Sequence, residues 1–175
     1  YEIDNLDSIH KEWKNSEIYE LLNDIKTDQS TVYHQYFYKN IHKTDWYNIY
    51  NSFIEEIVRP HFEESILYQK IPTFRVHQPS NLAVAAFHRD REYSHSIYVI
   101  NFFLPMTKAF GNNTVWIEKN EGSETFMPLE ADVGECIMWD GANLLHGNHI
   151  NDTGISRVSV DFRILPFSKY EENNK

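Results

Sequence analysis

The stretch GECIMWDGANLLHGNHINDTGISRVSVDFRILP, residues 134–166, alternates short apolar runs with clusters of turn residues. Residues 135–139 and 157–165 have the β-branched and aromatic content of strands. Residues 140–143 and 151–154 contain the Gly, Asn and Asp that tight turns prefer. This part of the chain is therefore predicted to form short strands joined by turns.

The same pattern continues upstream as far as about residue 71. Further strands are predicted at residues 74–78, 82–88, 96–104 and 114–118. Many short strands at nearly regular spacing favour an antiparallel sandwich or barrel.

The first 70 residues have helical periodicity instead. Apolar residues recur at helical spacing in two segments: Ile18, Leu21, Leu22 and Ile25 in the first, and Trp46, Ile49, Tyr50, Phe53 and Ile57 in the second. Thr44 or Asp45 can cap the second helix, and Pro60 breaks it. We expect a single domain over residues 1–175, with a helical layer at 1–70, a β core at 71–168 and a polar tail at 169–175.

Composition excludes several classes of protein. The 16 Lys and Arg against 26 Asp and Glu give a net charge of -10, which argues against binding of nucleic acid or of an anionic membrane. The single cysteine, Cys136, cannot form an intramolecular disulfide, so any metal is held by His, Asp or Glu. No apolar run approaches the roughly 18 residues of a membrane span, and a soluble cytoplasmic protein is expected.

Histidine and carboxylate residues provide a candidate metal site. Three pairs have the spacing His-x-carboxylate: His10 with Glu12, His61 with Glu63, and His88 with Asp90. The first two pairs fall in predicted helices, where residues i and i+2 point to different sides. His88 and Asp90 end a predicted strand, where such residues share a face and can bind one ion.

His146 is the best candidate for a third ligand, because it follows a strand and a turn at the far side of the β region. Two histidines and one carboxylate form the facial triad of non-haem Fe(II), which leaves open coordination positions. A structural zinc site would require four protein ligands.

Arg157 and Ser159 alternate with apolar residues in the strand that begins eleven residues after His146. One interpretation is an ordinary half-exposed strand with polar side chains in water. The other is that Arg157 and Ser159 point into the barrel and bind a carboxylate. An acid anchored there by a distal carboxylate, while its other end chelates the metal, would be 2-oxoglutarate.

His88, Asp90, His146, Arg157 and Ser159 together resemble the motif of the Fe(II)- and 2-oxoglutarate-dependent oxygenases. More narrowly, RVHQPSNLAVAAFHRDREYSH, NFFLPMTKAFGNNTVWIE and the stretch at 134–166 resemble the StrG-like dioxygenases of streptomycin-type biosynthesis. The resemblance covers residues 75–166, about half of the chain.

The resemblance implies a double-stranded β-helix, or jelly roll, with the N-terminal helices packed on one face. It also implies Fe(II), 2-oxoglutarate as cosubstrate and O2, with decarboxylation of 2-oxoglutarate to succinate and CO2. The expected reaction is hydroxylation of a small polar molecule such as a sugar, aminocyclitol or amino-acid derivative. The carboxylate of Asp90 favours hydroxylation, since halogenating relatives have lost it.

Four further residues are candidates for ligand contacts. Asn101 interrupts an apolar run, and its amide is expected either to contact 2-oxoglutarate or to be satisfied structurally. Tyr93 and His95 follow the His-x-Asp motif and are expected to contact the substrate. Trp116 is a substrate candidate at the mouth of the barrel, although a core Trp116 and a solvated Glu118 form the simpler interpretation.

Three alternatives stay open. Arg157 and Arg163 also match an Arg-x5-Arg spacing of AlkB-type nucleic-acid dealkylases. Gly134, Gly141 and His146 loosely resemble the second cupin motif. A jelly-roll module that binds a ligand without catalysis is the third. The sequence leaves the substrate and the oligomeric state open.

Overall fold

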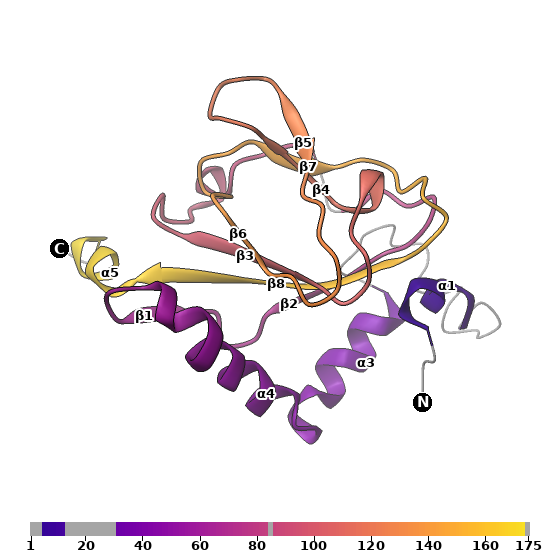
Figure 1. Cartoon of the computed structure of the whole chain (residues 1–175), viewed down its shortest axis with the longest axis horizontal. Coiled ribbons are helices and arrows are strands. Elements are labelled where there is room, and N and C mark those ends of the chain that lie inside the picture. Colours follow the sequence, from indigo (N-terminus) through magenta and orange to yellow (C-terminus); the bar gives the residue numbers. More distant parts are fainter. Residues whose placement is uncertain (1–4, 13–30, 84–85, 174–175) are drawn as a thin grey trace.

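The computed structural model describes residues 5–12, 31–83 and 86–173. The helical stripe predicted at residues 18–25 lies outside them. The described chain is mainly β with some helices, and its strands form two antiparallel sheets (Figure 1).

The larger sheet has five strands. Their order is β1 (Ile66–Tyr68), β8 (Arg157–Pro166), β3 (Ile100–Pro105) and β6 (Ile137–Trp139), with β2 (Thr73–His77) also paired with β8. The smaller sheet has three strands, in the order β5 (Phe126–Pro128), β4 (Val115–Glu118) and β7 (His146–Asn148). The antiparallel, strand-rich architecture predicted from the turn pattern is confirmed.

Of the segment predicted as a strand at 82–88, the described residues at its two ends form isolated bridges. Leu82 pairs with Ile150, and His88 pairs with His146, both in antiparallel fashion. The chain thus crosses from the larger sheet at β2 to the edge of the smaller sheet, and His88 lies beside β7.

The helices precede the sheets, apart from one at the C-terminus. They are α1 (Ile9–Glu12), α3 (Val32–Asn40), α4 (Trp46–Phe53) and α5 (Phe167–Asn173). The 3-10 turns are Leu6–Ser8, Ile41–Lys43, Arg59–His61, Asp90–Tyr93 and Gly111–Asn113. A π-helical turn, Ile54–Val58, extends α4. Figure 1 shows α3 and α4 on one side of the larger sheet and the smaller sheet on the other.

Strand β8 lies between the helical layer and the space that separates the two sheets, and its side chains alternate between these two sides. Val158, Val160, Phe162 and Ile164 are each 1% exposed and pack against α3 and α4. The intervening residues, from Arg157 to Arg163, face the smaller sheet. A separate apolar cluster around Phe103 and Ile117 fills part of the space between the sheets.

The predicted apolar stripe of α4 is partly wrong. Tyr50, Ile54 and Val58 are buried, whereas Ile49 is 67% exposed and Ile57 is 56% exposed. The π-helical turn accommodates an extra residue per turn. It rotates Ile57 off the buried face and moves Val58 onto it.

Other boundaries also differ from the predictions. The expected strand at 96–104 begins only at Ile100, because residues 96–99 form a turn in which the Val99 amide donates to the Ser96 carbonyl at 3.1 Å. The expected polar tail forms α5, whose Ser168 amide donates to Glu64 at 2.8 Å. Within the described part of the chain, no helix has the length and apolar character to cross a membrane.

Candidate metal centre

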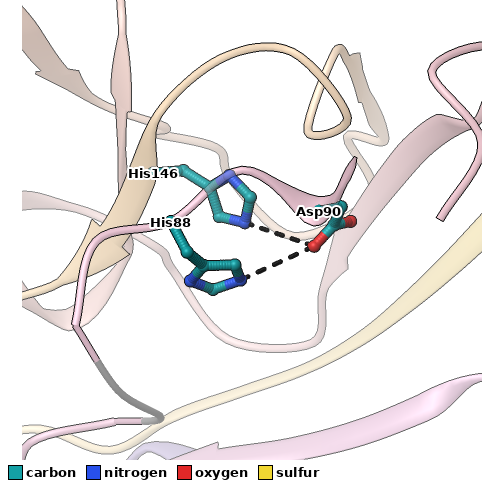
Figure 2. A group of neighbouring side chains, drawn as sticks. All are labelled: His88, Asp90 and His146. Carbon is teal, nitrogen blue, oxygen red and sulfur yellow. Dashed lines mark ion pairs between the residues drawn. The ribbon is translucent and has the colours of Figure 1, made fainter. Parts of the chain in front are cut away.

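His88, Asp90 and His146 come together between the two sheets (Figure 2). Each offers a ligand atom, and these atoms all lie within 4.8 Å of one another. Asp90 Oδ1 is 3.6 Å from His88 Nε2 and 3.7 Å from His146 Nε2. These separations are too long for hydrogen bonds and suit three atoms around one ion.

The backbone sets this convergence. The His88 amide donates to the His146 carbonyl at 2.9 Å, and the His146 amide donates to the His88 carbonyl at 3.0 Å. This two-way pairing places the imidazole rings side by side, with centroids 4.4 Å apart. Asp90 begins a 3-10 turn, and its amide donates to the Gly141 carbonyl at 3.0 Å.

The tautomers of both histidines are fixed by backbone carbonyls. His88 Nδ1 lies 3.1 Å from the Ala86 carbonyl, and His146 Nδ1 lies 3.0 Å from the Leu144 carbonyl. Because a carbonyl oxygen only accepts, each Nδ1 carries the proton. Two Nε2 lone pairs and a carboxylate oxygen therefore point at one place, and this donor set fits non-haem Fe(II).

The second oxygen of Asp90 is held by other side chains. Asp90 Oδ2 accepts from Asn101 Nδ2 at 2.8 Å and from Arg163 Nε and Nη2 at 3.1 and 3.0 Å. Burial raises the pKa of Asp90, whereas the Asn101 hydrogen bond and the Arg163 charge lower it. The lowering effects are together the larger, so the pKa of Asp90 is below its ordinary value. Asp90 is thus an anion with one oxygen oriented toward the histidines.

Burial lowers the pKa of His146, and the neighbouring His88 and Arg163 act in the same direction. The Leu144 hydrogen bond and Asp90 oppose this effect without reversing it. The imidazole of His146 is therefore favoured in the neutral form that a metal requires.

A cavity of about 320 Å³ adjoins the three residues. Its other polar or aromatic lining includes Arg75, Tyr93, His95, Asn101, Phe103, Trp139, Asn148, Asp161 and Arg163. Arg75 forms an ion pair with Asp161 across β2 and β8. The cavity therefore holds paired charges, and polar side chains surround its metal-binding corner.

The structure brings some of the predicted ligand-binding residues to this cavity. Tyr93 and His95 line it, and the Tyr93 ring packs edge-on against His88 with centroids 5.1 Å apart. Asn101 also lines the cavity, but its amide donates to Asp90. In this structure Asn101 orients a ligand residue, which is the structural alternative that the sequence left open, and its place in the cavity lining keeps the contact with 2-oxoglutarate a proposal.

Arg157 and Ser159 lie deeper. Both are fully buried, and Arg157 donates to Ser159 Oγ at 2.8 Å and to the Asn113 carbonyl at 3.0 Å. Neither belongs to the described residues that line the cavity. The guanidinium carbon lies 5.7 Å from the ring centroid of Phe103, which itself lines the cavity.

Trp116 is placed on the outer side of the smaller sheet. Val115 lines the cavity, so the next side chain along the strand points away from it. Trp116 Nε1 donates to the Gly111 carbonyl at 3.0 Å, and its ring packs against His149. Trp116, a substrate candidate from the sequence, is therefore not among the described residues that line the cavity.

The sequence did not indicate the structural importance of two residues near the site, Glu118 and Gly141. Glu118 was interpreted as solvated, yet it is 1% exposed. A Cβ on Gly141 would lie 2.5 to 3.0 Å from the side-chain atoms of Asn101. From the sequence Gly141 was a turn residue and part of a loose cupin-like match, and neither interpretation indicated its contact with Asn101, because spatial crowding leaves no signal in a single sequence.

Comparison with known proteins assigns the chain to a family. No family model matches the chain. The chain is 43% identical over 150 residues to the streptomycin biosynthesis protein StrG of Streptomyces griseus, a match that covers 86% of this chain and 70% of StrG.

Solved structures with a similar fold include EvdMO1, with a TM-score of 0.52, 19% identity and coverage of 72% of this chain and 34% of EvdMO1. The nickel complex of the non-haem monooxygenase ThoJ has a TM-score of 0.51, 12% identity and coverage of 85% of this chain and 64% of ThoJ. This chain thus spans about a third of EvdMO1 and under two thirds of ThoJ.

The fold and the site define a mainly antiparallel β protein with a His, Asp and His cluster suited to a metal ion. By its similarity to StrG, the chain belongs to the StrG family.

Proposed function

We propose that this protein is a non-haem Fe(II)-dependent oxygenase that uses 2-oxoglutarate and O2 to hydroxylate a small polar molecule, such as a sugar, aminocyclitol or amino-acid derivative. The observation that carries the proposal is the convergence of His88 Nε2, His146 Nε2 and Asp90 Oδ1 at the end of a cavity. The similarity to a streptomycin biosynthesis protein supports a biosynthetic role, and the fold shared with a non-haem monooxygenase supports oxidative chemistry.

The path of the chain supports a jelly roll. From β2 the chain passes to His88 beside β7 of the smaller sheet, returns to β3, crosses to β4 and β5, and returns to β6. It then crosses to β7 and ends in β8. Such winding between two antiparallel sheets is typical of the double-stranded β-helix.

His88, Asp90 and His146 would hold the iron, and the bound iron would supply oxygen activation. The protein's own residues orient the three ligand side chains. Arg163 and Asn101 hold Asp90 Oδ2, so that Oδ1 stays directed toward the histidines. Tyr93 packs against the ring of His88, and Trp139 packs against the ring of His146, which restricts the orientation of both imidazoles.

In this proposal Arg157 and Ser159 bind the distal carboxylate of 2-oxoglutarate. They support that role because they form a buried, hydrogen-bonded cation and hydroxyl on the face of β8 that also carries Asp161 and Arg163. A carboxylate that reaches Arg157 from the cavity passes the Phe103 ring, which lines the cavity and lies beside the Arg157 guanidinium. Arg75, which lines the cavity directly, is the competing anchor.

The test is an anaerobic titration of 2-oxoglutarate into protein loaded with Fe(II), followed by the visible charge-transfer band of the chelate. Removal of a charge-assisted hydrogen-bond donor costs about 1.5 to 3 kcal/mol, so Arg157→Gln should weaken 2-oxoglutarate roughly 10- to 100-fold. Arg75→Gln should leave the affinity within about twofold of wild type. If Arg75→Gln weakens 2-oxoglutarate binding and Arg157→Gln does not, the distal carboxylate binds to Arg75 instead.

Metal binding without a charge-transfer band would instead favour the cupin-type enzyme or the non-catalytic binding module. An AlkB-type dealkylase is disfavoured, because Arg163 is engaged by Asp90 and the net charge is -10.

A further inference from the structure

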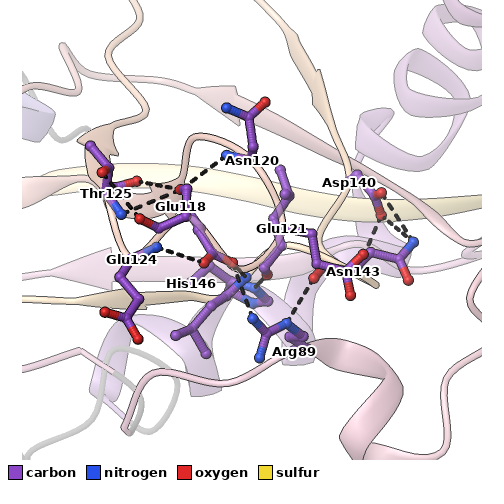
Figure 3. Close-up of polar contacts among 12 residues, drawn as sticks. Arg89, Glu118, Asn120, Glu121, Glu124, Thr125, Asp140, Asn143 and His146 are labelled. Atoms are coloured by element: carbon purple, nitrogen blue, oxygen red, sulfur yellow. Dashed lines mark hydrogen bonds and ion pairs between the residues drawn. The ribbon is translucent and has the colours of Figure 1, made fainter.

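Glu118 lies outside the cavity, at the end of β4, but it is connected to both halves of the candidate metal centre (Figure 3). Its carboxylate oxygen Oε2 accepts from Arg89 Nη2 at 3.1 Å and from the Leu145 amide at 3.3 Å. Arg89 stands between His88 and Asp90 in the chain, and Leu145 directly precedes His146. One buried carboxylate thus joins the two segments that carry the three ligand residues.

Further bonds fix Glu118 itself. Its amide donates to the Leu145 carbonyl at 2.8 Å, so Glu118 and Leu145 are joined by backbone and side chain alike. The other carboxylate oxygen, Oε1, accepts from the Glu124 amide at 3.1 Å. With a side chain 1% exposed, Glu118 has little freedom to follow a displaced partner.

Arg89 is equally constrained. Its Nε donates to the Asn143 carbonyl at 2.9 Å, and its Nη2 pairs with Glu118. The Arg89 side chain is only 19% exposed. Because side chains alternate along an extended segment, Arg89 points away from the cavity into which His88 and Asp90 point. The Arg89 and Glu118 pair therefore stabilises the two segments from behind the ligands.

We propose that Glu118 is a positioning residue for the metal centre: by binding Arg89 and the Leu145 amide, its carboxylate sets the position of His88 and Asp90 relative to His146. This inference rests on the proposed function, since it needs a metal at these residues. Loss of residues that support metal ligands typically lowers metal affinity roughly 10- to 100-fold.

Glu118→Gln keeps the shape of the side chain and removes its charge. A Gln amide offers one acceptor oxygen and presents donors where the other oxygen stood, so at least one of the bonds to Arg89, Leu145 and Glu124 is lost, and the bond to Arg89 is no longer an ion pair. Glu121→Gln is the matched control. Glu121 also accepts from an arginine beside the motif, Arg91, at 2.7 Å, but its side chain is 52% exposed, and this ion pair does not reach the His146 segment.

The experiment is a titration of the purified protein with Co(II), read by the visible ligand-field spectrum and by competition with a chelator. We expect Glu118→Gln to bind Co(II) about 10- to 100-fold more weakly and to show a changed spectrum when saturated, while Glu121→Gln matches wild type. Arg89→Gln should change the spectrum in the same way, and the double variant should bind no more weakly than Glu118→Gln alone.

A purely structural role would lower the thermal midpoint of the metal-free protein and leave the saturated spectrum and the affinity unchanged, which would overturn the inference. If Glu118→Gln gives no cooperative unfolding transition, the spectrum of Arg89→Gln decides the question. Failure of the wild-type protein to bind Co(II) would instead overturn the proposed function.

Discussion

Asp90 presents its two carboxylate oxygens to different partners. Oδ2 accepts from Asn101 and Arg163, whereas Oδ1 faces His88 and His146. This division orients Asp90 before any ion binds, and the lowered pKa keeps it charged. Residues that crowd or hold the Asn101 amide therefore affect metal affinity without touching the metal.

Gly141→Ala tests this orientation. A Cβ at position 141 would lie 2.5 Å from Asn101 Nδ2, so the amide must move away from Asp90. We expect Fe(II) affinity, measured by anaerobic equilibrium dialysis, to fall by roughly tenfold or more. Combining Gly141→Ala with Asn101→Ala removes the clash, so the double variant should bind as Asn101→Ala does. Unchanged affinity in Gly141→Ala would refute the crowding argument.

Sequence reasoning identified the metal-binding candidates because the chemistry of a metal site restricts residue type and spacing. His88 and Asp90 share a face of an extended segment, and that follows from the period of two alone. Glu118 and Gly141 were not identified, because burial under a neighbouring loop and crowding by Asn101 depend on contacts between distant segments. For Trp116 the sequence left a mouth position and a core position open, because the phase of the strand relative to the cavity is a tertiary property.

Among the elements, β8 forms the boundary between the helical layer and the site. Phe162 is 1% exposed and stacks on Phe102 with ring centroids 4.9 Å apart, while its strand neighbours Asp161 and Arg163 line the cavity. The packing of one face therefore fixes the position of the other.

Phe162→Ala should lower the free energy of unfolding by about 3 to 5 kcal/mol, because it leaves a cavity between β8 and α4. Urea denaturation measures the change. Met138→Ala on β6 is the control, since Met138 is 57% exposed and its loss should cost no more than about 0.5 kcal/mol. A loss below about 1 kcal/mol in Phe162→Ala would contradict the packing of α4 against this strand.

The elements predicted best are those with long, regular patterns. The strand at 157–165 was expected within one residue of β8, since its alternation extends over the whole length. Strands β1, β5 and β7 were not predicted, since each has three residues, whereas β6, equally short, lies in the longer strand-like run at 135–139. The π-helical turn after α4 displaced the predicted stripe, because sequence periodicity assumes a uniform helix.

At the scale of the whole molecule, Glu118 links stability to pH. Burial raises the pKa of Glu118, whereas hydrogen bonds from the Glu124 and Leu145 amides and the charge of Arg89 lower it. The lowering effects are together the larger, so the pKa of Glu118 is below its ordinary value of 4.5. A carboxyl whose pKa is lowered in the folded state contributes stability that is complete above its unfolded pKa and is lost as pH falls through the folded pKa.

The thermal midpoint of wild type should therefore exceed that of Glu118→Gln by a constant amount above about pH 4.5, and the difference should shrink in more acidic solution. Calorimetry of the two proteins from pH 3 to pH 7 measures it. A difference that grows with acidity would show that the charged form is not the stabilising one.

We infer that His88, Asp90 and His146 form one metal site. Anaerobic Fe(II) binding by wild type and by His88→Ala, Asp90→Ala and His146→Ala, with each fold verified by its thermal transition, tests it most directly. We predict one tightly bound Fe(II) per wild-type chain and at least a 100-fold loss of affinity in each variant, because each removes one of three ligands. Wild-type affinity retained in any of the three variants would contradict the assignment.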